Sequence, residues 1–382
     1  MNNLLYFAPA SYGGLLNYTQ EQADAIAALG VDVQVVCSPN FIKREFDRYS
    51  VLPILMESRA PAGGNKILRG IRYIRILLKN MAILKAEIIK GEYKKVLFAA
   101  YTEYFSPLWA IPFIKLAQKG VEFGAVVQEP VRDFRVGPVC WHKLSIATAY
   151  RFLKYAFVHE SVTLDTGYCM SKLKTVVIPY GPHRFPSPSK PREVLRQQLG
   201  IPAEALVLLS FGHIRDNKNL DYAVRALVEI PDAFLLVAGK RSASSQRPES
   251  YYQDLAIKLG VADRCKWILE YVSEEDAANY FTASDLILLT YSSSFRSASG
   301  VLHVAARYEK PSIVSAGQGS LQSVVRKYGI GLWVEPDSPY AVVEGIKTWV
   351  NCPRKPDWES YRVDNSWILN AKIVLDSFKS AD

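Results

Sequence analysis

Two cations, Arg215 and Lys218, follow a short apolar run that stops at Gly212. The run, Leu206–Phe211, has the composition of a buried strand, and an amphipathic helix is predicted to begin near Leu220. A strand, a glycine turn, a cationic loop and a helix start would place backbone amides, the positive end of a helix and two fixed charges around one crevice. The pattern favours a diphosphate site, and an ordinary surface turn is the alternative.

A second candidate phosphate site lies at Ser299, Gly300, Val301 and Leu302, after the apolar run 286–289. If a helix begins at Gly300, the free amides of residues 300–302 point out of its N-terminus. Ser299 then fits the N-cap position, where its hydroxyl either caps the helix or binds a phosphate. Because both loops follow strands of the same expected parallel sheet, we expect them to face the same crevice.

The first forty residues predict a strand, a glycine-containing loop, a helix and a second strand. Gly13 and Gly14 lie in the loop, and the helix is expected from Tyr18 to Leu29. This is the usual opening of a doubly wound sheet. The loop lacks the GxGxxG spacing, so it is no dinucleotide fingerprint.

Polar residues end two further predicted strands of the first half. Gln128 and Glu129 follow the run 121–127, while His159 and Glu160 end the strand that starts at Tyr155. Such positions face the ligand crevice of a parallel sheet, so the four residues are candidates for sugar or acceptor contacts. Glu129 is also kept as a catalytic candidate. Ordinary loops at strand ends are the alternative.

The length of 382 residues exceeds what one compact core normally supports, so two domains are expected. Prolines crowd the stretch 182–191, which predicts a linker and a boundary near residue 182. The second half then alternates strands and helices, which predicts a parallel sheet with helical crossovers. Within the first half, the apolar stretch 107–116 is expected to be a helix broken at Pro112.

Composition narrows the class of protein. Apolar residues make up 49% and aromatic residues 12%, as in an ordered globular protein, and the net charge of +9 favours an anionic partner. The five scattered cysteines form no CxxC pair, which predicts reduced thiols in the cytosol and no zinc site. No signal peptide and no apolar stretch of spanning length is evident, so we expect a cytoplasmic protein.

The segment Lys66–Lys90 predicts a long basic amphipathic helix. Seven lysines and arginines alternate with apolar residues, against the single acid Glu87. Such a helix can lie on an anionic membrane surface, which would place the protein on the inner face of the membrane. The alternative is a helix packed on the sheet with its cations solvated.

The second half resembles the retaining GT-B glycosyltransferases of family 4, or group 1. The resemblance is carried by FGHIRDNKNLDYAVRAL (211–227), LLVAGK (235–240), LEYVSEEDAANYFTASDLILLTY (269–291) and SASGVLHVAARYEKPSIVS (297–315). The first half is similar through GGLLNYTQEQADAIAALGVDVQVV (13–36), VHE (158–160) and VIPYG (177–181), so nearly the whole chain is covered.

The resemblance implies an α/β fold of two Rossmann-like, doubly wound parallel-sheet domains that face a central cleft. Residues 1–182 would bind the acceptor and residues 183–355 the nucleotide-sugar donor. A C-terminal helix within 356–382 would cross back to pack on the first domain.

The resemblance also implies site roles. The diphosphate of a UDP or GDP sugar would be bound by Gly13, Gly14, Gly212, Arg215, Lys218, Ser299, Gly300, Val301 and Leu302. The nucleoside would be contacted by Tyr271 and Val272. Arg215 and Lys218 would stabilise the leaving phosphate. No cofactor and no metal is expected, and the sugar would pass with retention to a glycan or lipid-linked hydroxyl in cell-surface polysaccharide or glycolipid assembly.

Four positions depart from the family pattern. The glutamates of an E-x7-E pair are replaced at about Arg296 and Val304, the strand-end histidine by Gln128, and a glycine by Asn219. The first change puts the sugar and ribose contacts in doubt.

Other functions remain open. A nucleotide-sugar epimerase shares the fold, and a hinged two-domain protein that binds a ligand without catalysis is a second alternative. No motif or basic–aromatic alternation supports nucleic acid as a partner.

Overall fold

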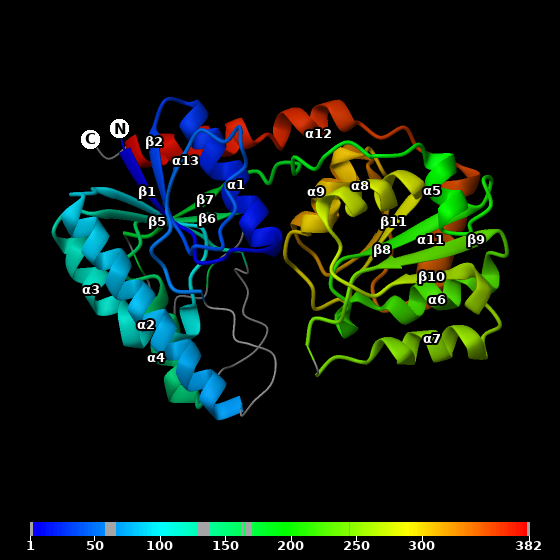
Figure 1. Cartoon of the computed structure of the whole chain (residues 1–382), viewed down its shortest axis with the longest axis horizontal. Coiled ribbons are helices and arrows are strands. Elements are labelled where there is room, and N and C mark those ends of the chain that lie inside the picture. Colours follow the sequence, from blue (N-terminus) through cyan, green and yellow to red (C-terminus); the bar gives the residue numbers. More distant parts are fainter. Residues whose placement is uncertain are drawn as a thin grey trace. The chain divides into compact units, whose positions relative to one another are not determined.

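The computed structural model describes residues 3–57, 66–128, 137–161, 164, 170, 172–243 and 245–379. The chain forms two compact units (Figure 1). Unit 1 contains residues 1–181 together with 365–382, and unit 2 contains residues 182–364. The candidate residues of the first half and those of the second half therefore belong to separate units.

Unit 1 is built on a seven-stranded sheet. Its strands are β1 (Asn3–Phe7), β2 (Asp32–Val36), β3 (Ser50–Leu52), β4 (Lys95–Phe98), β5 (Glu122–Val126), β6 (Tyr155–Val158) and β7 (Lys174–Val177). Its helices are α1 (Gly13–Ala28), α2 (Lys66–Lys90), α3 (Ser106–Gln118), α4 (Val139–Ala149) and α13 (Trp367–Lys379).

The strand order in unit 1 is β3-β2-β1-β4-β5-β6-β7, with every pair parallel. The order reverses direction between β1 and β4, which is the switch point where ligands bind in open parallel sheets. Helices α2, α3 and α4 lie along one face, and α1 and α13 pack together on the other (Figure 1). Both faces of the sheet are thus covered, which explains the nearly continuous apolar strands.

Unit 2 repeats the plan with six strands. They are β8 (Leu206–Phe211), β9 (Ala233–Ala238), β10 (Cys265–Ile268), β11 (Leu286–Thr290), β12 (Ser312–Ser315) and β13 (Gly331–Trp333). The helices are α5 (Arg192–Gln198), α6 (Leu220–Glu229), α7 (Glu249–Lys258), α8 (Glu274–Ala283), α9 (Gly300–Arg307), α10 (Ser320–Tyr328), α11 (Pro339–Asn351) and α12 (Trp358–Asp364).

The strand order in unit 2 is β10-β9-β8-β11-β12-β13, again all parallel. Alternate residues of β8 enter different cores, since Val207 and Leu209 pack with α8 and α9 while Leu208 packs with α6 and α11. The predicted α/β class with two parallel-sheet domains is confirmed, and the switch point of unit 2 lies between β8 and β11.

The end of the chain divides between the units. Helix α12 belongs to unit 2, where Tyr361 bonds His303 on α9 (2.7 Å between the hydroxyl and Nδ1). Helix α13 belongs to unit 1, where the side chain of Asn370 bonds Gln22 on α1 (2.7 Å). The C-terminal helix expected within 356–382 corresponds to α13, which packs on α1 of unit 1, and it is preceded by the short helix α12 of unit 2.

Two local expectations are wrong. Helix α3 continues through Pro112, because buried Trp109 and Phe113 anchor both sides of it and the carbonyl that loses its partner belongs to the exposed Leu108. The pair Gly13–Gly14 forms the first turn of α1 and not a loop ahead of it.

No helix in the described ranges combines the length and apolar character needed to cross a bilayer.

Candidate functional site

The loops that follow β8 and β11 meet at the switch point of unit 2. Gly212 comes directly after β8, and Gly300 begins α9 beyond the end of β11. A Cβ placed on Gly212 would lie 3.4 Å from Nζ of Lys218 and 3.8 Å from Cγ2 of Val301. The structure therefore brings together the first turn of α9, Gly212 and Lys218, as predicted from their places at neighbouring strand ends.

Two glycines make this close approach sterically feasible. Gly212 has φ +86°, a left-handed value that disfavours any side chain. A Cβ on Gly239 would collide with the carbonyl oxygen of Gly212, whose own amide donates to Ala238 (2.8 Å). The backbone after β8 is consequently pressed against the backbone after β9.

The end of β11 holds the cationic loop in place. Residues 216–218 form one 3₁₀ turn, and the carbonyl of Lys218 accepts a hydrogen bond from the Thr290 hydroxyl (2.7 Å). The amide of Ser292 donates to the carbonyl of Asn217 (2.9 Å). The loop is fixed at two points before any ligand arrives, which is the condition for preorganised binding.

Asn219 and Asp337 close the other side of this loop, and sequence reasoning missed the second of them. Asn219 has φ +48°, a conformation that asparagine tolerates better than most residues. The Asp337 carboxylate accepts from the Ser293 amide (2.9 Å) and contacts the Asn219 amide (3.5 Å). Asp337 thereby joins the loops after β8, β11 and β13. The left-handed φ of Asn219 is the only sign of this contact, and it is visible in the structure and not in the sequence.

The charges at the site are positive and unbalanced. The amine of Lys218 donates to the Phe211 carbonyl (2.9 Å), and burial together with the charge of Arg215 lowers its pKa to about 7. Burial, Arg215, Lys218 and Lys240 also lower the pKa of His213. These cations disfavour one another's charge, so the site gains most from a ligand that carries several negative charges.

Ser299 differs from its predicted role. It occupies the N-cap position of α9, but its side chain makes no cap bond and is 3% exposed. Its hydroxyl instead bonds the hydroxyl of Tyr291 (2.9 Å), whose ring stacks on Phe295 with 3.9 Å between ring centroids. Ser299 therefore supports the loop. Gly300, Val301 and Leu302 form the first turn of an eight-residue helix, and the Leu302 amide, expected to be free, donates to the Ser299 carbonyl (3.0 Å).

The nucleoside candidates lie in the loop after β10. Tyr271 is 67% exposed, whereas Val272 packs half-buried against the core of unit 2. A large exposed aromatic ring offers a surface on which a base can stack.

In unit 1, Gly13 and Gly14 border open space. Gly13 has φ +69°, and a Cβ on either glycine would meet no atom within 4 Å. The need for glycine at residue 13 is thus conformational, and the exposed first turn of α1 resembles that of α9.

The sugar and acceptor candidates fall in different environments. Glu129 lies outside the described residues. Gln128 lies two residues beyond the end of β5, with its Nε2 buried and without a hydrogen-bond partner among the described residues. Glu160 is half-buried at the end of β6.

His159 is not placed for proton transfer in this structure. It bonds the Ile178 carbonyl (3.1 Å) and packs against the rings of Tyr18 and Tyr180. Burial lowers its pKa to about 4, so the ring is neutral near pH 7. The environment is that of a structural histidine.

Within the described ranges, no three His, Cys, Asp or Glu side chains gather in a way that would hold a metal ion.

Residues 191–363 match the sequence family described as glycosyl transferases group 1. A similar curated protein is D-inositol 3-phosphate glycosyltransferase of Streptomyces scabiei, 28% identical over 213 residues, which are 53% of this chain and 42% of that protein. The chain thus matches less than half the length of this relative.

Solved structures resemble the whole chain. Sucrose-phosphate synthase of Thermosynechococcus elongatus superposes with a TM-score of 0.72 at 17% identity, covering 100% of this chain and 99% of that one. Anabaena HepE, solved in complex with UDP and glucose, superposes with a TM-score of 0.70 at 15% identity and covers 100% of both. Both likenesses agree with the GT-B fold expected from the sequence, and the part of the chain that matches the group 1 glycosyltransferases is the part of unit 2 that contains the cationic loop and α9.

Proposed function

We propose that this protein transfers a sugar from a UDP or GDP sugar to an acceptor hydroxyl. The observation that carries the proposal is the convergence of Gly212, Lys218 and the first turn of α9 at the switch point of a group 1 unit. HepE, which shares the fold, was solved with UDP and glucose, and this supports the choice of donor.

The chemistry follows from where charge develops. As the bond between the sugar carbon and the phosphate oxygen breaks, negative charge grows on the leaving diphosphate and positive charge on the sugar ring. Arg215, Lys218 and the amides of Gly300 and Val301 would stabilise the leaving group as hydrogen-bond donors, whereas the amide of Leu302 already donates to the Ser299 carbonyl (3.0 Å). The sequence resemblance implies retention, in which the acceptor oxygen attacks from the side of the departing phosphate and that phosphate takes its proton.

Tyr271 and Val272 are assigned to the nucleoside, while Gln128, Glu129, His159 and Glu160 remain candidates around the sugar and acceptor. His159 is the weakest of these, since its ring is already packed and neutral. Catalysis by this account needs no metal ion.

The acceptor is proposed to belong to cell-surface polysaccharide or glycolipid assembly, with unit 1 touching an anionic membrane. The start of α2 supports this, because Ile67, Leu68 and Ile71 are 71%, 65% and 44% exposed beside the exposed cation Arg69. Exposed apolar residues interleaved with cations suit a surface of anionic lipid.

A donor panel tests the transferase. Purified protein is incubated with UDP and GDP sugars, and release of the nucleoside diphosphate is followed with and without candidate acceptors. We expect release from at least one donor and a loss of about tenfold or more in Arg215→Ala, since a charge-assisted bond to the phosphate is removed. No release from any donor, together with unchanged nucleotide affinity in Arg215→Ala, would refute the proposal.

Sedimentation with phosphatidylglycerol vesicles tests the membrane contact. We expect binding at low salt that is lost at high salt and in Leu68→Ser/Ile71→Ser. Ile257→Ser, which removes an exposed apolar side chain from α7 of unit 2, is the control. Equal sedimentation of both variants and the parent would rule the contact out.

A further inference from the structure

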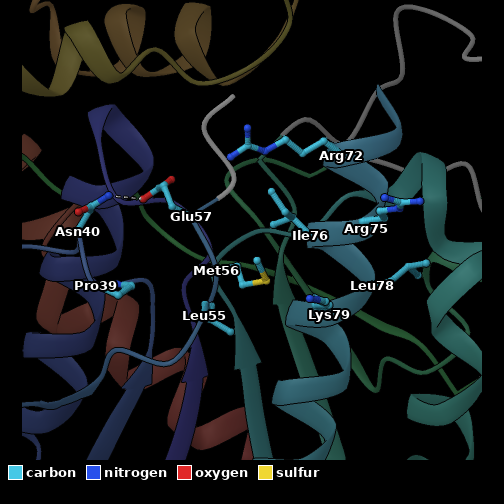
Figure 2. A pocket seen from close by; sticks show the side chains of 10 residues that line it. All are labelled: Pro39, Asn40, Leu55, Met56, Glu57, Arg72, Arg75, Ile76, Leu78 and Lys79. Atoms are coloured by element: carbon cyan, nitrogen blue, oxygen red, sulfur yellow. Dashed lines mark hydrogen bonds between the residues drawn. The ribbon is translucent and has the colours of Figure 1, made fainter. Parts of the chain in front are cut away.

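A pocket of about 900 Å³ opens at the carboxyl edge of the unit 1 sheet (Figure 2). One wall comes from the segments that follow β2 and β3, and the other from the middle of α2. The lining residues are Pro39, Asn40, Leu55, Met56, Glu57, Arg72, Arg75, Ile76, Leu78 and Lys79.

The two walls are locked together. Asn80 on α2 is 4% exposed and bonds the backbone of Met56 in both directions, accepting from its amide (2.7 Å) and donating to its carbonyl (2.9 Å). Leu55 and Ile76, both buried, supply an apolar floor. The segment after β3 is therefore fixed to α2 before any ligand binds.

One wall carries unmatched positive charge. Arg72 and Lys79 lie seven positions apart, two turns of α2, and so share a face of that helix with Ile76 between them. Both are exposed, and within the described part of the chain neither forms a hydrogen bond or an ion pair. Arg72 extends from α2 toward Glu57 (Figure 2).

The opposite wall offers side-chain oxygens held in place. The Glu57 carboxylate accepts from the hydroxyls of Ser11 (2.7 Å) and Ser38 (3.0 Å) and from the Asn40 amide (3.2 Å). These donors follow β1 and β2, so Glu57 ties together the loops at three strand ends. The same edge of the sheet carries Gly13 at the start of α1.

We infer that this pocket binds a phosphate group of the acceptor, with the cations of α2 on the phosphate and the Asn40–Glu57 wall beside a hydroxylated body. The inference rests on the proposed function, because it names the class of acceptor: a phosphorylated sugar or polyol. Cations and polar oxygens on facing walls, above an apolar floor, match a molecule with a phosphate, hydroxyls and an apolar ring face. The phosphate belongs either to a soluble ester or to a lipid headgroup.

Calorimetric titration with sn-glycerol 3-phosphate tests the pocket in the full chain. The parent carries Arg215→Ala and Lys218→Ala, so that the loops of unit 2 no longer attract phosphate. We expect saturable binding, weakened about tenfold or more by Arg72→Gln/Lys79→Gln, since two charge-assisted contacts are removed. Lys85→Gln/Lys90→Gln is the control, because it removes the same charge from exposed positions of α2 outside the pocket.

Absence of binding to the parent, or equal weakening in the two paired variants, would overturn the inference. Matching thermal midpoints of the two variants confirm that both are folded. Vesicles of phosphatidylglycerol distinguish the sources of the phosphate. Weaker sedimentation of Arg72→Gln/Lys79→Gln than of the control supports a lipid headgroup, and equal sedimentation with weakened glycerol phosphate binding supports a soluble ester.

A separate measurement keeps this test apart from that of the transferase. In the otherwise native chain, Arg72→Gln/Lys79→Gln should keep nucleoside diphosphate binding while raising the KM for a phosphorylated acceptor. Intact nucleotide binding without phosphate binding in the pocket refutes only the acceptor inference. Absence of nucleotide binding and donor turnover refutes the transferase itself.

Discussion

Burial of Lys218 disfavours the positive charge that the binding of a phosphate would require. Its amine is held by one backbone carbonyl, and burial beside Arg215 lowers its pKa to about 7. A polyanion in contact with the amine would favour the protonated form and raise the pKa again. The residue is thus neutral in part when the site is empty and charged when it is filled.

Nucleotide binding above pH 7 should therefore take up protons at Lys218. We expect an uptake approaching one proton per site at pH 8, and an affinity that falls by up to about tenfold per pH unit above 7. Calorimetry in buffers of different ionisation enthalpy measures the uptake, and Lys218→Met should abolish it. A binding enthalpy of the native protein that does not depend on the buffer would contradict the assignment.

At His159, by contrast, the shift of the pKa is linked to the stability of the folded chain. Its folded pKa of about 4 lies below the reference value of 6.5, so protonation favours the unfolded chain. The stability contributed by the neutral ring is complete above pH 6.5 and is lost as the pH falls toward 4.

We accordingly expect unit 1 to lose about 1–3 kcal/mol of stability between pH 6.5 and 4 through His159. Thermal unfolding of the native protein and of His159→Gln across this range measures the effect. The variant should be less stable near pH 7 but should lack this part of the acid sensitivity. Parallel pH profiles for the two proteins would exclude the residue as the cause.

At the scale of elements, the candidate site of unit 2 is made by the loops that follow β8 and β11 at the switch point of its sheet. The segments that follow the neighbouring strands β8 and β9 pack closely, because Gly239 lies against the backbone of Gly212. Any side chain there must displace the turn that faces Lys218 and α9. The geometry of the anion site thus depends on a residue that does not touch the ligand.

Gly239→Ala should weaken nucleotide binding by about tenfold, since a displacement of the order of 1 Å is costly in a preorganised site. Gly260→Ala is the matched control: its φ of +68° is also positive, and a Cβ there meets no atom within 4 Å. Titration of UDP into the two folded variants makes the comparison. Equal affinities would mean that the packing of Gly239 on Gly212 does not set the site.

The alternation of strands and helices in unit 2 could be predicted because its apolar runs are short and end at glycine, proline or polar residues. Leu206–Phe211 was predicted with the bounds that β8 has. Short elements without a strong apolar period, such as β3 and α10, could not be recognised. Ser299 was assigned to the cap or the phosphate because nothing in the sequence links it to Tyr291, its partner in space.

The pocket beside α2 is a second feature that could not be predicted from the sequence. The basic periodicity of Lys66–Lys90 predicted a surface for anions, but the sequence does not connect this helix to Met56 or Glu57. Only the fold, through the bonds of Asn80 to the Met56 backbone, turns a charged helix into one wall of a pocket.

At the scale of the whole molecule, the chain contains two parallel-sheet units of like topology. Unit 2 carries the group 1 sequence and the cationic loop, while unit 1 carries the exposed start of α2 and the pocket. The chain passes between the units twice, at residues 181–182 and 364–365, so that its last segment returns to unit 1. The account requires donor recognition to reside in unit 2.

The affinity of the full chain for UDP and GDP, compared with that of Arg215→Ala, tests this central claim most directly. We expect saturable binding of at least one nucleotide, weakened about ten- to a hundredfold in Arg215→Ala because a charge-assisted phosphate contact is lost. Arg225→Ala, which removes an exposed cation from α6, should bind as the native protein does. Equal affinities of the native protein and Arg215→Ala, or no binding of either nucleotide, would contradict the account.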